Sequence, residues 1–300
     1  MTGPDEQPNR AAYGDRAADA ARTESVSGDA TRAIAPGPDR WWTADSVAVM
    51  RERLGNDVCR RLCIYPLPER FLLSVIIPVF NEARTVNSVI ERVRATTIPV
   101  QLIIVDDGSD DGTSESLASY RDAADVDLIR HAKNRGKGAA IASALRVARG
   151  DVVVVQDADQ EYDPQDFRRL MQPIVEGDAD VVYGSRYGHF EGLVSPWWHQ
   201  ATNRFLSGLA SVAIGIRLHD VETCYKMVRR ESVMTIVDSL REARFGIEIE
   251  LTAKLARQGL RFAERPIRYR PRWYGEGKKI RARDGLRALW CILIYGVLRR

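Results

Sequence analysis

The sequence has few cysteines, and their spacing excludes the sites that cysteine-rich proteins build. Its 300 residues include four, Cys59, Cys63, Cys224 and Cys291. They lack the pair-and-pair spacing of a structural zinc site, and four thiols are too few for a disulfide scaffold in a chain of this length. We therefore expect reduced thiols in a cytoplasmic protein.

Long hydrophobic runs are also absent. The longest apolar stretch, 288–298, has 11 residues, whereas about 20 are needed to span a bilayer. This excludes a polytopic membrane protein. The stretch predicts either a buried helix or a helix that lies at a membrane surface.

Charge is unevenly distributed along the chain. The formal net charge is +3, yet residues 261–300 carry 12 Lys and Arg against 3 acids, and the first 260 residues carry 32 against 38. A basic C-terminal segment indicates an anionic partner. Nucleic acid, phosphate esters and anionic lipid all fit that charge.

Composition and periodicity divide the chain into segments. Residues 1–40 have almost no large apolar side chains and predict a disordered leader. Residues 41–68 predict a helical segment that is capped by Thr43 and interrupted at Gly55. Beyond them, short β-branched runs alternate with helical periodicity, which predicts an α/β fold with a mostly parallel sheet. The expected strands are 72–79, 100–105, 126–130, 151–156 and 180–183, with helices at 84–95, 113–120, 138–149 and from Pro164.

Polar residues follow these strands at the edge where ligands bind in parallel sheets. Two carboxylates, Asp157 and Asp159, come directly after the buried run 152–155. Burying such a pair is costly unless a cation compensates it, and Mg²⁺ or Mn²⁺ with phosphate oxygens as further ligands would do so. The segment 133–138 has two glycines and several cations at a helix start, which favours an anion.

The remaining motifs exclude two common nucleotide-binding classes. The segment 133–138 is not a P-loop, and no G-x-G-x-x-G follows the first strand. These absences argue against a P-loop NTPase and a dinucleotide oxidoreductase.

Five sequence motifs follow one another along the chain: SVIIPVFNE at 74–82, VDDGS at 105–109, NRGKG at 134–138, DAD at 157–159 and GSR at 184–186. In this order they resemble family-2 glycosyltransferases, and most closely their dolichol- or polyprenyl-phosphate hexosyltransferase branch. The resemblance implies a GT-A fold, which is a Rossmann-like sheet with a C-terminal acceptor-side extension. Residues 69–185 would then bind the nucleotide sugar and residues 186–300 would face the acceptor. The resemblance also implies inversion at the anomeric carbon.

The resemblance also implies roles for individual residues. It assigns donor binding to Pro78, Phe80, Glu82, Asp106, Asp107, Lys137, Asp157 and Lys278. It assigns the metal, Mg²⁺ or Mn²⁺, to Asp157, Asp159 and Glu161, where Glu161 occupies a position at which relatives often have Gln. It assigns acceptor binding to Arg186, His199 and Arg204, and catalysis to Asp159, Arg186, Lys279 and Glu250.

Several alternatives remain open at this point. A lipid phosphate acceptor is already anionic, whereas a hydroxyl acceptor of a glycan or small molecule needs a general base, for which Glu248 and Glu250 are candidates. Those two residues equally fit N-terminal helix charges. The alternation of Arg268, Arg270 and Arg272 predicts a solvated face, with phosphate or anionic membrane contact as the second interpretation.

The functional prediction is a metal-dependent hexosyltransferase that uses UDP-glucose or GDP-mannose and a polyprenyl-phosphate-type acceptor. It would be cytoplasmic, with peripheral contact at the inner face of an anionic membrane, and no nucleic-acid partner is expected. The alternative from another class is a non-catalytic nucleotide-sugar or nucleic-acid binding protein. Intact Asp157 and Asp159 favour the enzyme.

Overall fold

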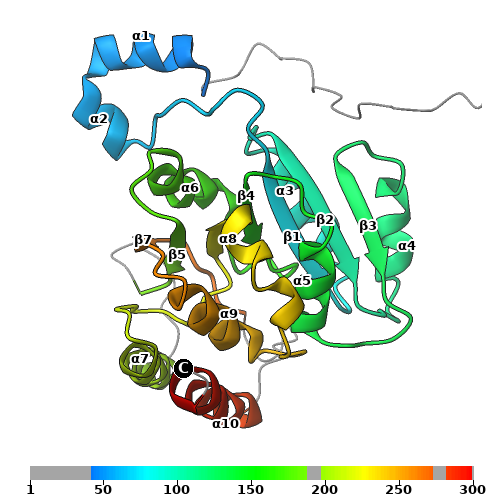
Figure 1. The fold of residues 1–300 in the computed structure, drawn as a ribbon. Coiled ribbons are helices and arrows are strands. Elements are labelled where there is room, and N and C mark those ends of the chain that lie inside the picture. The colour runs from blue at the N-terminus through cyan, green and yellow to red at the C-terminus, as the bar shows by residue number, and fades with distance from the viewer. Residues whose placement is uncertain (1–41, 188–196, 273–281, 299–300) are drawn as a thin grey trace, which may run out of the picture. The chain divides into compact units, whose positions relative to one another are not determined.

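The computed structural model describes residues 42–187, 197–272 and 282–298. The expected leader 1–40 and the cations Lys278 and Lys279 lie outside these ranges, as does the side chain of His199. Helices and strands alternate through the first described range, as the sequence predicts (Figure 1).

A seven-stranded sheet forms the centre of the fold. Its order is β3-β2-β1-β4-β6-β5-β7, and the pairs β1–β2, β1–β4, β2–β3 and β5–β7 are parallel. The five strands predicted from apolar runs are all present, so the mostly parallel α/β sheet is confirmed. The strands are β1 (Leu73–Val79), β2 (Val100–Asp106), β3 (Val126–Arg130), β4 (Val152–Val155), β5 (Val181–Ser185), β6 (Lys226–Arg229) and β7 (Phe262–Pro266).

Strands β6 and β7 are new relative to the sequence prediction. The four-residue strand β6 lies antiparallel between β4 and β5, with Val154 opposite Met227 and Tyr183 opposite Lys226. Because it runs against its neighbours, its first residue lies at the edge where β4 and β5 end. Residues that precede β6 are thereby brought to the carboxyl edge of the parallel strands.

Helices pack against this sheet and close its core. The helix α5 contacts β1 and β2, and α6 contacts β5, β6 and β7. Strands β1, β2 and β4 are buried along almost their whole length, as expected for parallel strands covered on both faces. The helices that follow the strands are α3 (Val86–Arg94), α4 (Thr113–Leu117), α5 (Lys137–Leu145), α6 (Phe167–Val175), α8 (Arg230–Met234) and α9 (Ile247–Ala256).

The segment before β1 forms two short helices, as predicted. Thr43 accepts a hydrogen bond from the Ser46 N–H and caps α1 (Ala44–Leu54). Gly55, at a φ of 83°, separates α1 from α2 (Asn56–Arg61), because a left-handed φ suits glycine. Arg60 then joins α2 to the end of α6 through an ion pair with Glu176.

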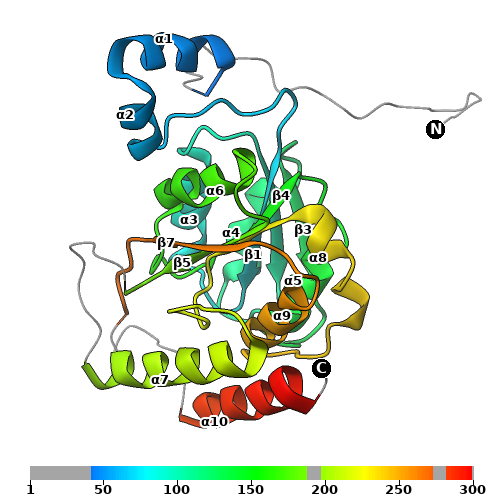
Figure 2. The ribbon, with the colours of Figure 1, turned by 60° about the vertical axis from the view of Figure 1, so that its left-hand side comes forward.

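Two helices from the second half of the chain lie side by side (Figure 2). They are α7 (Trp197–Ile214) and α10 (Ala282–Cys291), which continues as the π-helical segment η5 (Ile292–Leu298). Gly296 of η5 packs against Ala213 of α7, and a Cβ at Gly296 would lie 2.8 Å from that of Ala213. Among the described residues, no helix is long and apolar enough to cross a membrane.

Candidate active site

Charged side chains converge at the edge where β4 ends and β6 begins. Lys137, the first residue of α5, places its Nζ 2.8 Å from Asp157 Oδ1 and 3.1 Å from Glu248 Oε1. The other oxygen of Glu248 lies 2.5 Å from Lys226 Nζ. Two lysines and two carboxylates therefore form a continuous chain that runs from the buried Lys226 to the partly exposed Asp157.

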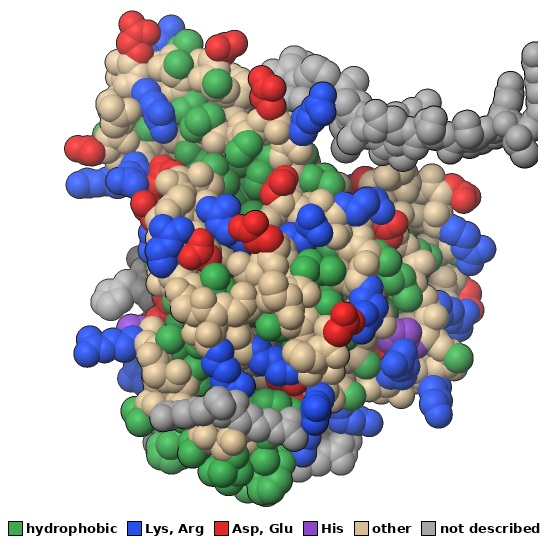
Figure 3. All heavy atoms as spheres, viewed as in Figure 1, with side chains coloured by type: hydrophobic (Ala, Val, Ile, Leu, Met, Phe, Trp, Pro, Cys, Tyr) green, Lys and Arg blue, Asp and Glu red, His purple; other side chains and the backbone are tan. Residues whose placement is uncertain are grey.

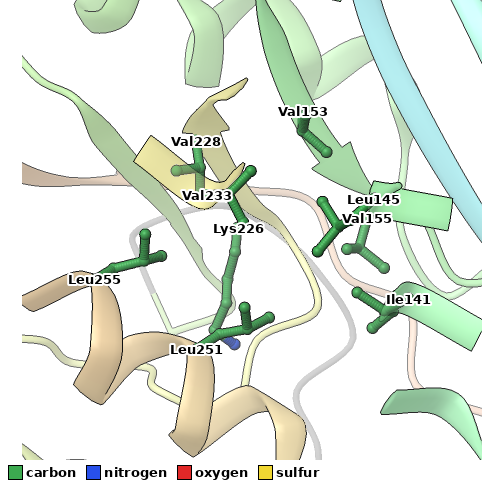
Figure 4. Close-up of a pocket in the computed structure, with 9 residues that line it drawn as sticks. All are labelled: Ile141, Leu145, Val153, Val155, Lys226, Val228, Val233, Leu251 and Leu255. Carbon is green, nitrogen blue, oxygen red and sulfur yellow. The ribbon is translucent and has the colours of Figure 1, made fainter. Parts of the chain in front are cut away.

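Lys226 reaches this chain from inside the core. Its side chain passes a small apolar cavity lined by residues of α5, β4, β6, α8 and α9, and Figure 4 shows its nitrogen at the α9 end, near Leu251. Its Nζ also donates to the Thr223 carbonyl at 2.5 Å. An unpaired lysine would be costly here, so Glu248 is committed to neutralising it.

Opposite charges keep this site ionised. Burial by itself raises the pKa of Asp157, but Lys137, with smaller contributions from Cys224 and Arg186, opposes it, and the pKa of Asp157 is lowered overall. Burial likewise lowers the pKa of Lys137, and the attraction of Asp157 and the other anionic groups around it raises the pKa well above its ordinary value. Both groups thus stay charged at neutral pH.

A second cation lies across the carboxylates that follow β1 and β4. Arg272 Nη2 is 2.8 Å from Asp159 Oδ2 and 2.9 Å from Glu82 Oε1. Sequence alternation favoured a solvated face for this arginine, and that interpretation is wrong for Arg272, whose side chain is only 18% exposed. Its contact with the expected donor-binding and metal-binding carboxylates puts it inside the site.

The three carboxylates expected to hold a divalent cation differ in the contacts that they make. Asp157 and Asp159 each already face a cationic side chain, so each oxygen pair suits a positive charge. Glu161 instead accepts from the Tyr269 hydroxyl at 2.6 Å and from the Arg272 N–H at 2.9 Å. In the described part of the chain, no three His, Cys, Asp or Glu side chains gather as a metal site. Asp157 and Asp159 fit a hard cation completed by ligand phosphate oxygens, and the role expected for Glu161 as a third ligand stays a prediction.

The turn after β2 is built by its own aspartates. Asp106 accepts from the Ser109 N–H at 2.9 Å. Asp107 Oδ1 lies 2.6 Å from His131 Nδ1, and its Oδ2 accepts from the Gly136 N–H at 2.6 Å. Asp106 thus shapes this turn and Asp107 holds the loop before α5, while the donor-binding roles expected for both stay predictions. His131 is a partner that sequence reasoning missed.

The helix start at α5 differs from the expected anion site. The N–H groups of Arg135 and Gly136 donate to Asp107, and the Ala139 N–H donates to the Ala243 carbonyl. The loop is pressed against backbone, because a Cβ at Gly138 would lie 2.0 Å from the Glu242 carbonyl oxygen. These amides are therefore not free for phosphate, and Lys137 is the cation of this segment that points into the site.

The residues expected to bind the donor at the end of the first strand lie at the end of β1, and Glu82 among them contacts Arg272. Glu82 is buried and accepts from the Thr85 hydroxyl at 2.8 Å. Pro78 and Phe80 are half-buried at the end of β1. All three therefore occupy the edge that the resemblance assigned to the donor.

A buried arginine network follows β5. Arg186 makes a two-pronged ion pair with Asp220, with Nε 2.8 Å from Oδ2 and Nη2 2.7 Å from Oδ1. Its guanidinium also lies over the Tyr269 ring at 5.3 Å from the centroid. Burial lowers the pKa of Arg186, but Asp220 raises it well above its ordinary value. Tyr269 thus lies between Arg186 and Glu161, and so connects the acceptor-side and metal-side groups.

Two other expected residues lie outside the Arg186–Asp220 ion pair. Arg204 is exposed on α7, next to Asn203, whose side-chain oxygen accepts a hydrogen bond from Arg186. Glu250 is fully buried, accepts from the N–H groups of Arg241 and Glu242 and pairs with Lys254 at 2.7 Å. The expectation that Glu250 is catalytic gains no support, because its oxygens are committed to the loop before α9.

The sequence analysis assigned no role to Glu222. Its Oε1 is buried and has no hydrogen-bond partner in the described part of the chain, and the same holds for Oγ1 of the adjacent Thr223. Burial raises the pKa of Glu222 to about 7. Position alone gave no signal, because Glu222 reaches the site only through the antiparallel strand β6.

This sheet and its carboxyl-edge site define a glycosyltransferase of GT-A type. The model of glycosyl transferase family 2 matches residues 74–237, and the chain belongs to that family. Its curated relatives include polyprenyl-phosphate sugar transferases, so the expected branch is confirmed. The chain is therefore a glycosyltransferase.

Individual relatives show how far the likeness extends. The polyprenol monophosphomannose synthase of Mycolicibacterium smegmatis is 31% identical, over 68% of this chain and 79% of its own. The undecaprenyl-phosphate mannosyltransferase of Micrococcus luteus is 30% identical, over 68% and 85%. Glycosyltransferase AglD of Haloferax volcanii is 29% identical over 71% of this chain, which spans only 35% of AglD.

A solved structure confirms the fold. Glucosyl-3-phosphoglycerate synthase from Mycobacterium tuberculosis, in complex with Mn²⁺, UDP and phosphoglyceric acid, superposes with a TM-score of 0.59. The two share 20% identity, and the match covers 88% of this chain and 84% of the other.

Proposed function

We propose that this glycosyltransferase moves a hexose from a nucleotide-diphosphate sugar, UDP-glucose or GDP-mannose, to a polyprenyl-phosphate-type acceptor with inversion. The observation that carries the proposal is the adjacency of two charged centres at one sheet edge. One is the Asp157–Lys137 centre after β4, and the other is the Arg186–Asp220 pair after β5. The relatives named for polyprenyl-phosphate transfer supply the acceptor class.

The donor side follows from the carboxylates and their cations. Asp157 and Asp159 would hold Mg²⁺ or Mn²⁺ together with the donor diphosphate, and the cation would stabilise the charge that develops on the leaving nucleoside diphosphate. Lys137 keeps Asp157 ionised. Arg272 would exchange its contacts with Asp159 and Glu82 for the diphosphate and ribose of the donor.

The acceptor side follows from Arg186. Inverting transfer is a single displacement, in which the acceptor oxygen attacks the anomeric carbon opposite the leaving diphosphate. A phosphate oxygen is already anionic, so orientation by Arg186 matters more than a base. A hydroxyl acceptor would need a base, and Glu248 and Glu250 are both committed to lysines. The phosphate acceptor is therefore the better supported of the two.

An apolar surface on α7 and α10 fits a lipid acceptor. Large apolar side chains recur every three or four residues on both helices, and Figure 3 shows hydrophobic side chains gathered over these helices at the lower edge. We assign this α7–α10 apolar face to the surface of the bilayer that carries the acceptor, because such spacing suits an interfacial helix. Its exposed members are Phe205, Leu209, Val212, Leu286, Trp290, Leu293, Val297 and Leu298.

The test is transfer of radiolabelled hexose from each donor to short-chain polyprenyl phosphate, with Mg²⁺ or Mn²⁺ and with chelator. The proposal expects metal-dependent lipid product that is lost in Asp159→Asn and kept in the control Asp178→Asn, whose exposed side chain pairs with Arg60 far from the site. Nucleotide-sugar binding without product on any phosphate acceptor would contradict it.

A further inference from the structure

Glu222 stands out among the carboxylates on the acceptor side. Asp157, Asp220 and Glu248 each have a cation within ion-pair distance. Glu222 Oε1 has no hydrogen-bonding partner in the described ranges, and the neighbouring Thr223 Oγ1 is equally unsatisfied. Buried polar atoms are nearly always paired, so two adjacent unpaired ones indicate a place for a polar ligand.

The charges around Glu222 show which form of it a ligand would meet. Lys137, Lys226 and Arg186 are the cations of this cluster, and Asp157, Glu248 and Asp220 already balance them. An ionised Glu222 would add an uncompensated negative charge. Arg186 alone cannot neutralise the charge of a phosphate, because its Nε and Nη2 both donate to the carboxylate of Asp220.

The groups that act on Glu222 come from every side of the cluster. They are Lys226 on β6, Glu248 on α9, Arg186 and Tyr187 after β5, Asp220 in the loop before β6, and Cys291 on α10. Burial is the main influence, and it favours the neutral acid, while Lys226 and Arg186 oppose it. The acid form can donate one hydrogen bond, which the carboxylate cannot.

Resting on the function proposed above, we propose that Glu222 in its protonated form is an acceptor-binding residue that donates a hydrogen bond to a phosphate monoester held beside Arg186. Its proton lets a dianionic phosphate enter a cluster whose cations are already neutralised. Deprotonation would set a carboxylate against the phosphate and weaken acceptor binding. Glu222 would thus make acceptor binding, but not donor binding, sensitive to pH.

The test separates binding of the acceptor from turnover. In the wild-type enzyme, the acceptor KM should rise about tenfold between pH 7 and pH 8.5, since one group with a pKa of about 7 controls it. The donor KM should not follow this rise. Glu222→Gln, which keeps a donor and cannot ionise, should remain active and show an acceptor KM that varies less than twofold over the same range.

A second variant and a binding measurement test the proposal even if Glu222→Gln does not fold or does not turn over. Glu222→Asp, which is shorter, should raise the acceptor KM at pH 7, and calorimetric titration of acceptor into enzyme with nucleoside diphosphate should show the same pH dependence without turnover. Short-chain polyprenyl phosphate and glycerol 3-phosphate serve as acceptors. A pH effect with both assigns the contact to the phosphate, and an effect with the lipid alone overturns that assignment.

The other possible results distinguish failure of the role of Glu222 from failure of the proposed function. A flat acceptor KM in a wild-type enzyme that transfers hexose overturns the role of Glu222 and leaves the function intact. Loss of kcat in Glu222→Gln with an unchanged acceptor KM makes Glu222 a base and also overturns it. Absence of transfer to any phosphate acceptor overturns the proposed function itself.

Discussion

Arg272 and Asp159 form an ion pair of 2.8 Å at the end of β4, so an arginine occupies the position that a divalent cation would share with this carboxylate. The same guanidinium contacts Glu82, and its Nε is buried without a hydrogen bond in the described residues. The guanidinium of Arg272 thus lacks one of the hydrogen bonds that it could donate. Binding of a cation and a donor would compete for both of its carboxylate partners.

This competition predicts the effect of removing the arginine. In Arg272→Ala, Mn²⁺ binding to the donor-free enzyme should tighten roughly fivefold, because a partly exposed ion pair contributes about 1 kcal/mol. Paramagnetic resonance of free Mn²⁺ measures this. The matched control is Arg268→Ala, which removes an arginine paired with Asp166 instead. Unchanged or weaker Mn²⁺ binding in Arg272→Ala would show that Arg272 does not compete with the cation.

Lys137 is expected to be essential for stability as well as for donor binding. Lys137→Met would leave Asp157 with no cation within ion-pair distance among the described residues, and it would remove one of the two lysines that face Glu248. Removing one partner of a buried pair costs about 3 kcal/mol or more. Urea unfolding at pH 7 measures the loss against Lys133→Met, an exposed lysine of the same loop. A loss no larger than that of the control would contradict the described charge chain.

Glu222 gives the protein a pH-dependent stability of known sign. Its pKa is raised from 4.5 to about 7 by folding, so the native state binds the proton more tightly than the unfolded state. Stability then falls as pH rises from about 5 to 8, by up to about 3 kcal/mol. Glu222→Gln removes this dependence. The stability of the variant relative to the wild type should therefore increase as the pH rises over that range. The measurement is the free energy of unfolding of both proteins at several pH values in that range. The same pH dependence in both would contradict a buried Glu222 that holds its proton.

The α7–α10 apolar face predicts lipid binding that depends on apolar contact. Val212 is 79% exposed on α7 and Leu286 is 71% exposed on α10. The double variant Val212→Glu with Leu286→Glu should lower co-sedimentation with anionic liposomes by about tenfold or more, since each charge opposes burial in the interface. Val49→Glu is the matched control, because Val49 is an exposed valine of α1. Equal sedimentation of all three proteins would rule out this face as the docking surface.

Strands β1 to β5 could be predicted from the sequence, because each of them carries an apolar run long enough to recognise. Asp157 and Asp159 follow β4 directly, so their position at the carboxyl edge followed from the strand itself. Arg186 could be placed in the same way, one residue beyond β5. Local sequence was sufficient wherever a functional residue lies next to a predicted strand.

The remainder of the site depends on contacts between distant segments. Strand β6 has only four residues, and Lys226 and Arg229 at its two ends leave only two apolar residues between them. The sequence therefore indicated neither the presence of this strand nor its antiparallel direction. Lys226 and Glu222 reach the site only through that direction. Likewise, Arg272 meets residues 113 and 190 positions away in the chain, Asp159 and Glu82, and no local pattern encodes such pairs.

The central claim is that the acceptor is a phosphate, and a paired acceptor assay tests it most directly. The wild-type enzyme would be given polyprenyl phosphate and the matching polyprenol, each with UDP-glucose and with GDP-mannose, and the products analysed by mass spectrometry. The account predicts hexosyl phosphodiester from the phosphate alone, formed with one of the two donors. Hexose transferred to the hydroxyl of polyprenol as readily as to the phosphate would contradict it.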